Sequence, residues 1–138
     1  VMEKELVFRP LEKEDYETIC KWWKWWWKGK SLEKDLLPDN GKGGFVIEKN
    51  NQLITCGFLY LTNSKTSFLG WIVSNPEYKQ KDRKKIIKLL IYNMEQFSRE
   101  LGYEYIITVC SNKHLIDTHK DLGWVANKKP SYEIIKKL

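Results

Sequence analysis

The pattern of hydrophobic and polar positions divides the chain into short strands and amphipathic helices. Where a strand is expected, apolar residues alternate with polar ones or form short runs rich in β-branched residues. These runs predict strands at residues 4–11, 44–50, 53–63, 67–75, 103–111 and 131–138. Elsewhere apolar residues recur with a helical period of about 3.6. That period predicts helices at residues 12–26, 82–103 and 112–124, and a short one at 31–37.

The order of these elements limits how they can pair. Three consecutive strands between residues 44 and 75 predict an antiparallel meander, with turns at Asn50-Asn51 and at residues 63–65. The strand–helix–strand unit that follows requires a crossover, because parallel strands cannot be joined by a tight turn. We therefore expect a single domain over residues 1–138, with a mixed sheet covered by helices.

One helical segment is unusually aromatic, because residues 21–30, KWWKWWWKGK, hold five of the seven tryptophans. At about 100° per residue, six of the side chains in this helix form one stripe and predict its packing face. The six are Tyr16, Ile19, Cys20, Trp23, Trp26 and Trp27. Trp22 flanks the stripe, and Trp25 lies among lysines on the opposite side. Three explanations are open for Trp25: an early helix end near Lys24, a contact with another helix or a second subunit, or a wall of a substrate cleft.

Charge and cysteine content narrow the class of protein. The 24 Lys and Arg residues exceed the 18 Asp and Glu residues by six, which favours an anionic partner or serves solubility alone. Cys20, Cys56 and Cys110 are widely spaced, which indicates free thiols and a cytoplasmic location. His114 and His119 have no neighbouring cysteine, so no metal site is expected. No apolar run approaches the roughly 18 residues of a membrane span, and no signal peptide is recognisable.

The most informative segment is the strand, loop and helix start at residues 71–91. The N-terminus of a helix attracts anions, because its first N–H groups are free and its dipole is positive there. Five cations stand in this loop and first turn, where each opposes the dipole by a few tenths of a kcal/mol. They are Lys79, Lys81, Arg83, Lys84 and Lys85. A phosphorylated ligand would explain them, and a solvated basic face is the alternative.

Two motifs resemble the GNAT family of acetyl-CoA-dependent N-acyltransferases. NPEYKQKDRKKIIKLL at residues 75–90 is similar to the family's segment from strand 4 into the next helix, with its R/Q-x-x-G-x-G/A pattern. NKHLIDTHKDLGW at residues 112–124 is similar to the family's Asn followed by a helix that ends Y-x-x-x-G-F. The order of elements agrees over nearly the whole chain. The resemblance implies an α+β domain in α/β/α layers, with a mixed, mostly antiparallel sheet, helices on both faces, and splayed parallel strands 4 and 5.

The resemblance also implies a co-substrate and a reaction. The pantetheine arm of acetyl-CoA would lie between strands 4 and 5, pairing with backbone groups of Ile72 and Val73 and contacting Asn112. The pyrophosphate would bind the amides of Lys79, Gln80, Lys81, Asp82, Arg83 and Lys84. The acetyl group would pass directly from the thioester to an amine-bearing acceptor, without a metal.

This sequence departs from the motif where the family has glycines. Asp82 and Lys84 stand at these positions, and Lys79 replaces an Arg or Gln. The Asp82 carboxylate at the helix start could bond the same N–H groups that a phosphate needs. Either Asp82 turns away and the lysines hold the phosphates, or CoA binding is weak or absent.

The catalytic groups are harder to assign. His119 stands where the family has a tyrosine that protonates the leaving thiolate, and a histidine can supply that proton. The alternative is a histidine near a helix C-terminus with no catalytic role. The strand at residues 67–75 contains no acid, so Glu48 and Glu77 are the nearest candidates for a base. Trp25 and Glu48 are the candidate substrate residues.

The competing functional hypothesis is an inactive module of the same fold. Such a module would bind a protein or a nucleic acid through its lysines and indoles. Nucleic-acid binding is not favoured, because stacking platforms usually spread their aromatic residues over a sheet. The surplus of apolar rings in the first helix also suggests a homodimer.

Overall fold

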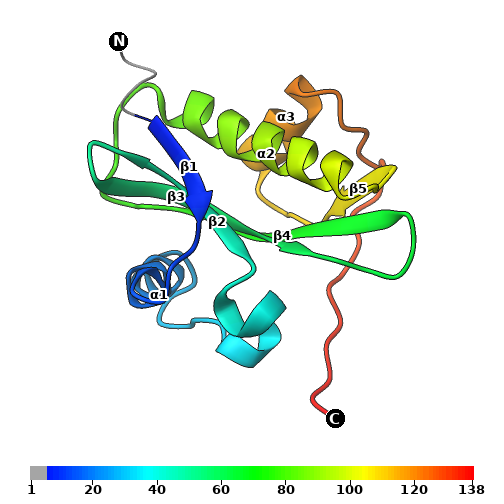
Figure 1. Ribbon diagram of the computed structural model, residues 1–138, viewed down its shortest axis with the longest axis horizontal. Coiled ribbons are helices and arrows are strands. Elements are labelled where there is room, and N and C mark those ends of the chain that lie inside the picture. The colour runs from blue at the N-terminus through cyan, green and yellow to red at the C-terminus, as the bar shows by residue number, and fades with distance from the viewer. Residues whose placement is uncertain (1–5) are drawn as a thin grey trace.

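The computed structural model describes residues 6–138 and places five strands in one sheet flanked by helices (Figure 1). The predicted start of the first strand, at residues 4 and 5, lies outside the described residues. The elements in chain order are β1 (Leu6–Pro10), α1 (Asp15–Trp26), β2 (Gly44–Lys49), β3 (Gln52–Tyr60), β4 (Thr66–Ser74), α2 (Arg83–Glu100), β5 (Tyr105–Thr108) and α3 (Lys113–Asp121). Two short 3-10 helices, η2 (Lys34–Leu36) and η3 (Pro38–Gly41), replace the single short helix predicted at residues 31–37.

The strands lie in the order β1-β2-β3-β4-β5, and only β4 and β5 are parallel. The meander and the crossover predicted from the sequence are therefore confirmed. β4 and β5 are paired only from Thr66 opposite Tyr105 to Leu69 opposite Thr108. β4 continues to Ser74 without this neighbour, so the two strands separate after residue 69.

A bulge in β4 marks the point of separation. Cys56 of β3 lies opposite Val73 and Phe58 lies opposite Gly70, so β4 carries one residue more than β3 over this stretch. Trp71 lies within this bulge and has a φ of 60°, in the left-handed region that a residue with a bulky side chain rarely adopts. A bulge bends its strand and increases the local twist, and here it adjoins the end of the pairing with β5.

The sheet has a core on each face. Ile19, Trp22 and Trp23 of α1 pack against Val46 and Phe58 on one face. On the other face α2 covers the sheet, and α3 lies beside α2 (Figure 1). The side chains of this second core include Ile86, Leu90 and Met94 of α2 with Ile54 and Leu69 of the sheet. The predicted three-layer arrangement is confirmed.

The packing face of α1 differs from the predicted stripe at its C-terminal end. Trp22 is 4% exposed, whereas Trp26 and Trp27 are 39% and 37% exposed. The helix stops at Trp26 and the chain turns through a left-handed Lys28, so helical spacing no longer applies to Trp27. Trp26 is drawn to the sheet edge, where its indole N–H donates to the Ser74 carbonyl at 2.8 Å. Trp25 is 62% exposed.

The predicted strand at residues 131–138 is wrong. The chain after α3 is irregular, and its side chains from Ser131 to Leu138 are exposed. A strand needs a neighbour to satisfy its backbone groups, and no described strand lies beside this segment. Among residues 6–138, no helix combines the length and the apolar character that crossing a membrane requires.

Candidate active site

The separation of β4 and β5 opens a cleft of about 320 Å³. Its walls come from the end of α1, the bulged part of β4, the chain after β5, the start of α3 and the C-terminal segment. The lining residues are Trp27, Phe68, Gly70, Trp71, Ile72, Thr108, Val109, Cys110, Ser111, Asn112, Leu115 and Glu133. The cleft therefore brings together Ile72 and Asn112, two of the predicted site residues, whereas Trp25 is not part of its lining.

Asn112 has one free polar group at this cleft. It is the N-cap of α3, and its side-chain oxygen accepts the Leu115 N–H at 3.1 Å. Its side-chain amide nitrogen has no acceptor among residues 6–138. Asn112 can therefore donate a hydrogen bond to a carbonyl group in the cleft without giving up its capping role. The neighbouring prediction, Val73, is buried, and its carbonyl accepts the Thr55 hydroxyl at 2.9 Å.

The N-terminus of α2 lies at the same end of the sheet as the cleft. The helix follows β4 and returns to the start of the parallel β5, so it begins where these two strands end (Figure 1). The backbone N–H groups of Lys84 and Lys85 have no acceptor in the part of the chain that the structure describes. Uncapped N–H groups and the positive end of the helix dipole together make an anion-binding position.

Asp82 does not fill this position. It stands at the N-cap of α2 but makes no capping hydrogen bond. One carboxylate oxygen accepts the Tyr78 hydroxyl at 2.6 Å, and the other accepts the Lys49 ammonium at 2.9 Å. These hydrogen bonds from Tyr78 and Lys49 lower the pKa of Asp82. The Asp82 carboxylate therefore turns away from the first turn of α2, as one of the two alternatives from the sequence requires.

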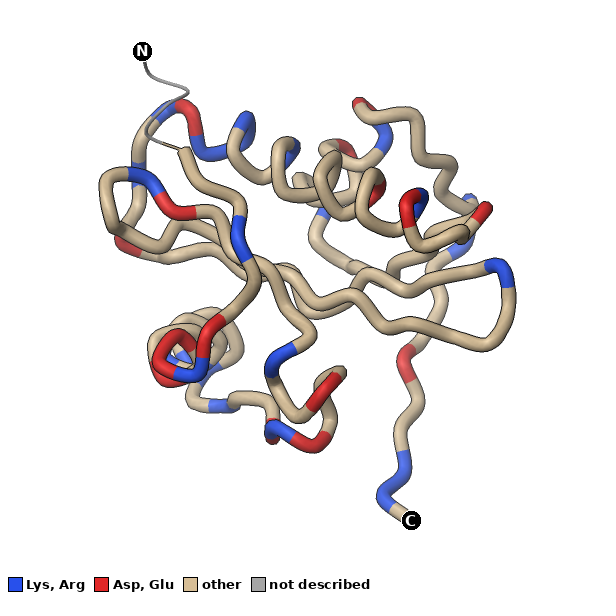
Figure 2. The backbone as a smooth tube through the Cα atoms, in the orientation of Figure 1, with Lys and Arg blue, Asp and Glu red and all other residues tan. Residues whose placement is uncertain are grey.

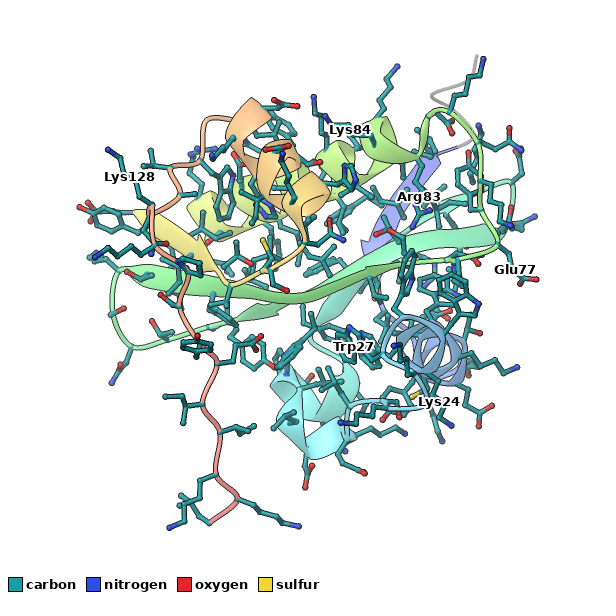
Figure 3. All side chains as sticks on the ribbon, turned by 180° about the vertical axis from the view of Figure 1, so that it is seen from behind. Lys24, Trp27, Glu77, Arg83, Lys84 and Lys128 are labelled. Atoms are coloured by element: carbon teal, nitrogen blue, oxygen red, sulfur yellow. The ribbon has the colours of Figure 1, made fainter. Side chains whose placement is uncertain are left out.

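Lys and Arg positions follow one another along the chain at the start of α2 (Figure 2). Lys84 reaches Asp121 of α3 at 3.1 Å, and the Arg83 guanidinium lies 5.2 Å from the centre of the Trp26 ring. Lys84 points away from the sheet, whereas Trp27 lies beyond the opposite face (Figure 3).

The other cations of this loop and first turn, Lys79, Lys81 and Lys85, are exposed and form no ion pair with a described residue. The loop and first turn that carry the free N–H groups thus also carry exposed cations.

His119 lies behind the cleft rather than in its lining. The residue is 4% exposed, and its ring packs edge-to-face on Trp124, with 4.7 Å between centres. The Nδ1 atom lies 2.8 Å from the Leu115 carbonyl, which can only accept, so Nδ1 carries the proton. The Nε2 atom is buried without a partner among the described residues. Desolvation by burial lowers the pKa of His119, which keeps the folded ring neutral at pH 7.

Comparison with protein families identifies the family of this chain. Residues 4–124 match the family described as the acetyltransferase (GNAT) family. The chain belongs to the GNAT family. The match spans both the free N-terminus of α2 and Asn112. A search of curated proteins finds no match.

Solved structures share the fold of this GNAT chain at low sequence identity. An aminoglycoside acetyltransferase from an uncultured soil metagenomic sample, meta-AAC0020 in complex with trehalose, is 13% identical with a TM-score of 0.68, covering 100% of both chains. Aminoglycoside N-acetyltransferase AAC(6')-Iy in complex with CoA is 18% identical with a TM-score of 0.66, covering 96% of this chain and 95% of that one. N-acetylglutamate synthase from Neisseria gonorrhoeae, complexed with coenzyme A and L-arginine, is 11% identical with a TM-score of 0.65, covering 83% of this chain and 26% of that one.

Neither candidate base of this GNAT chain lines the cleft. Glu48 accepts from Arg9 at 3.4 Å and is absent from the lining of the cleft. Glu77 lies on the exposed loop after β4 (Figure 3). Cys110 lines the cleft, but burial raises its pKa, so it remains a thiol.

The sequence predicts only Ile72 and Asn112 among the twelve lining residues, and it misses three that shape the cleft: Trp27, Trp71 and Glu133. Helical spacing puts Trp27 on the packing face of the helix, nothing in the sequence singles out Trp71, and Glu133 lies in the strand predicted at residues 131–138. The sequence pattern does not reveal the unusual φ of Trp71. It does not reveal the position of Glu133 either, because this residue lies in an irregular segment. The two motifs indicate this cleft through Ile72 and Asn112, whereas the run of tryptophans suggests Trp25 as a cleft wall instead of Trp27.

Proposed function

We propose that this GNAT chain transfers an acetyl group from acetyl-CoA to an amine. The observation that carries the proposal is the uncapped start of α2 at the end of the sheet where β4 and β5 separate. A ligand that joins an anionic group to an extended arm could place the anion at the start of α2 and the arm between β4 and β5.

The residues present fit the two parts of CoA. The free N–H groups of Lys84 and Lys85 suit a pyrophosphate, and the cations of the loop suit its charge. The predicted phosphate-binding residues Lys79, Gln80, Lys81, Asp82, Arg83 and Lys84 all belong to this loop and first turn. Asn112 would donate to a pantetheine carbonyl, and the unpaired edge of β4 around Ile72 would pair with the amides of the arm.

The proposed reaction is direct attack on the thioester. The lone pair of the amine nitrogen bonds to the carbonyl carbon, the carbon–sulfur bond breaks, and the proton lost by nitrogen balances the thiolate that leaves. His119 remains the proposed donor to sulfur. Because Nδ1 holds the proton in the folded ring and the ring is buried outside the lining of the cleft, that role requires a protonated Nε2 and a rearrangement that brings Nε2 to the cleft.

An acetyl-transfer assay tests this function. The full chain is incubated with acetyl-CoA and a set of amines, and acetylated products are measured by mass spectrometry. We expect amine-dependent consumption of acetyl-CoA, reduced in the Lys84→Glu, Lys85→Glu double variant and unchanged in Lys65→Glu, which alters a lysine of the β3–β4 turn. Consumption no faster than hydrolysis with any amine would contradict the activity.

Two further proposals concern the whole protein. The three cysteines are free, which supports a cytoplasmic location. Exposed apolar residues on β5, Tyr105 and Ile107, support a homodimer. Light scattering that returns the mass of one chain would contradict the dimer. If acetyl transfer failed, salt-dependent binding of a single-stranded oligonucleotide would favour the inactive-module alternative.

A further inference from the structure

The charge of the cleft is unusual for this chain. Twelve residues line it, and Glu133 is the only charged one among them. The protein has 24 Lys and Arg residues and a net charge of +6, yet no Lys or Arg among residues 6–138 lines the cleft. A positively charged ligand would therefore meet one carboxylate and no adjacent cation in the cleft wall.

The carboxylate of Glu133 is unpaired. It forms no ion pair and no hydrogen bond with any residue from 6 to 138, although four lysines belong to the same C-terminal segment. This segment leaves α3 and passes β5 and β4 toward the face that carries α1 (Figure 1). It thereby brings Glu133 to the rim of a cleft that is otherwise built from the helices and the sheet.

Two indoles form a fixed corner of the same cleft. The rings of Trp27 and Trp71 meet edge-to-face with 6.1 Å between their centres. Trp27 also stacks on the fully buried Trp23 at 6.0 Å, and the Trp71 indole N–H donates to the Tyr60 hydroxyl at 2.6 Å. Both rings are thus held in place, and aromatic faces attract alkylammonium groups by about 0.5–2 kcal/mol.

We propose that Glu133 and the indoles of Trp27 and Trp71 form the acceptor site, and that the acceptor binds as an organic ammonium ion on an apolar chain and releases one proton to water before its nitrogen attacks the thioester. The inference deepens the proposed function and rests on it, because the same cleft contains Ile72 and Asn112. The protein then separates its two ligands by charge. The anionic co-substrate meets the basic start of α2, and the cationic acceptor meets Glu133.

Calorimetric titration without CoA tests this site on the full chain. The probes are n-hexylamine and its neutral counterpart hexan-1-ol, at pH 7.5. We expect n-hexylamine to bind about tenfold more tightly than the alcohol, because one charge-assisted hydrogen bond contributes a difference in affinity of about this size. Glu133→Gln should remove this difference, and Glu133→Asp should restore part of it. The control Glu104→Gln, which alters an exposed carboxylate outside the cleft, should change neither affinity.

The outcomes separate this inference from the proposed function. Equal binding of the two probes, no binding of n-hexylamine, or an unchanged affinity in Glu133→Gln would overturn the acceptor site. The rise in melting temperature caused by CoA is measured on the same proteins and should be equal in wild type and Glu133→Gln. A wild type that binds the amine but is not stabilised by CoA would contradict the proposed function and leave the cation site standing.

Discussion

At the scale of single residues, Asp82 decides whether α2 can hold an anion. The sequence shows an acid where the family has glycine, but it cannot show which partner holds the carboxylate. Lys49 is 33 residues away in the chain, and it is brought to Asp82 by the packing of β2 beside the loop before α2. Hydrogen bonds from Lys49 and Tyr78 keep the carboxylate off the N–H groups of the first turn.

Releasing Asp82 should weaken CoA binding. In a Lys49→Met, Tyr78→Phe double variant the carboxylate is free to cap the N–H groups of Lys84 and Lys85 and competes with phosphate. We expect the dissociation constant for CoA, measured by calorimetry, to rise about tenfold, the size of one charge-assisted hydrogen bond. Adding Asp82→Ala to the double variant should recover most of the affinity. An affinity that stays at the wild-type value in the double variant would show that Asp82 is not restrained by these bonds.

His119 should make the stability of the protein depend on pH. Burial lowers its folded pKa below the unfolded value of about 6.5, so below that pH the unfolded chain binds a proton that the folded chain does not. The free energy of unfolding should be unaffected by this group above pH 6.5. It should fall below pH 6.5 by at most about 1.4 kcal/mol per pH unit, until the folded pKa is reached.

Urea unfolding at pH 7.5, 6.5 and 5.5 measures this effect. His119→Asn can keep a donor to the Leu115 carbonyl but cannot take up a proton. The variant should be less stable than the wild type at pH 7.5, and the difference should shrink at pH 5.5. A constant difference between the two proteins across this range would rule out the proposed burial of a neutral histidine.

At the scale of elements, α1 shows what periodicity predicts and where it stops. Ile19 and Trp23 are buried as the 3.6-residue spacing predicts, because they lie in the regular part of the helix. Trp26 and Trp27 are more exposed than this spacing predicts. The Trp26 indole N–H is bonded to the Ser74 carbonyl, and Trp27 follows the end of the helix. The helix therefore contributes both a core and, through Trp27, a cleft wall.

Alanine substitutions along α1 should separate these positions. Trp23 is fully buried against Phe58, so Trp23→Ala should lower the free energy of unfolding by about 3–5 kcal/mol. Trp25→Ala, at an exposed position on the same helix, should change it by less than about 0.5 kcal/mol. Urea unfolding of the two variants provides the comparison. Similar losses in both would mean that Trp25 is covered, for example by a second chain.

At the scale of the whole molecule, the sequence predicts the sheet better than the site. Hydrophobic patterns and short turns predict five strands, the meander and the parallel pair, because local geometry and chain connectivity determine them. The last predicted strand fails, since its formation depends on a neighbour that a pattern cannot reveal. The cleft combines Trp27, Trp71 and Glu133 from three distant segments, and only the folded chain shows that they meet.

Thermal unfolding with and without CoA tests the central claim, that the start of α2 and the opening between β4 and β5 hold this ligand. At a CoA concentration 100 times its dissociation constant, the free energy of unfolding should rise by about 2.7 kcal/mol. For a chain of this size, the melting temperature should then rise by about 8 °C. The Lys84→Glu, Lys85→Glu variant should show a much smaller rise at the same concentration. An unchanged melting temperature of the folded wild-type protein at millimolar CoA would contradict the claim.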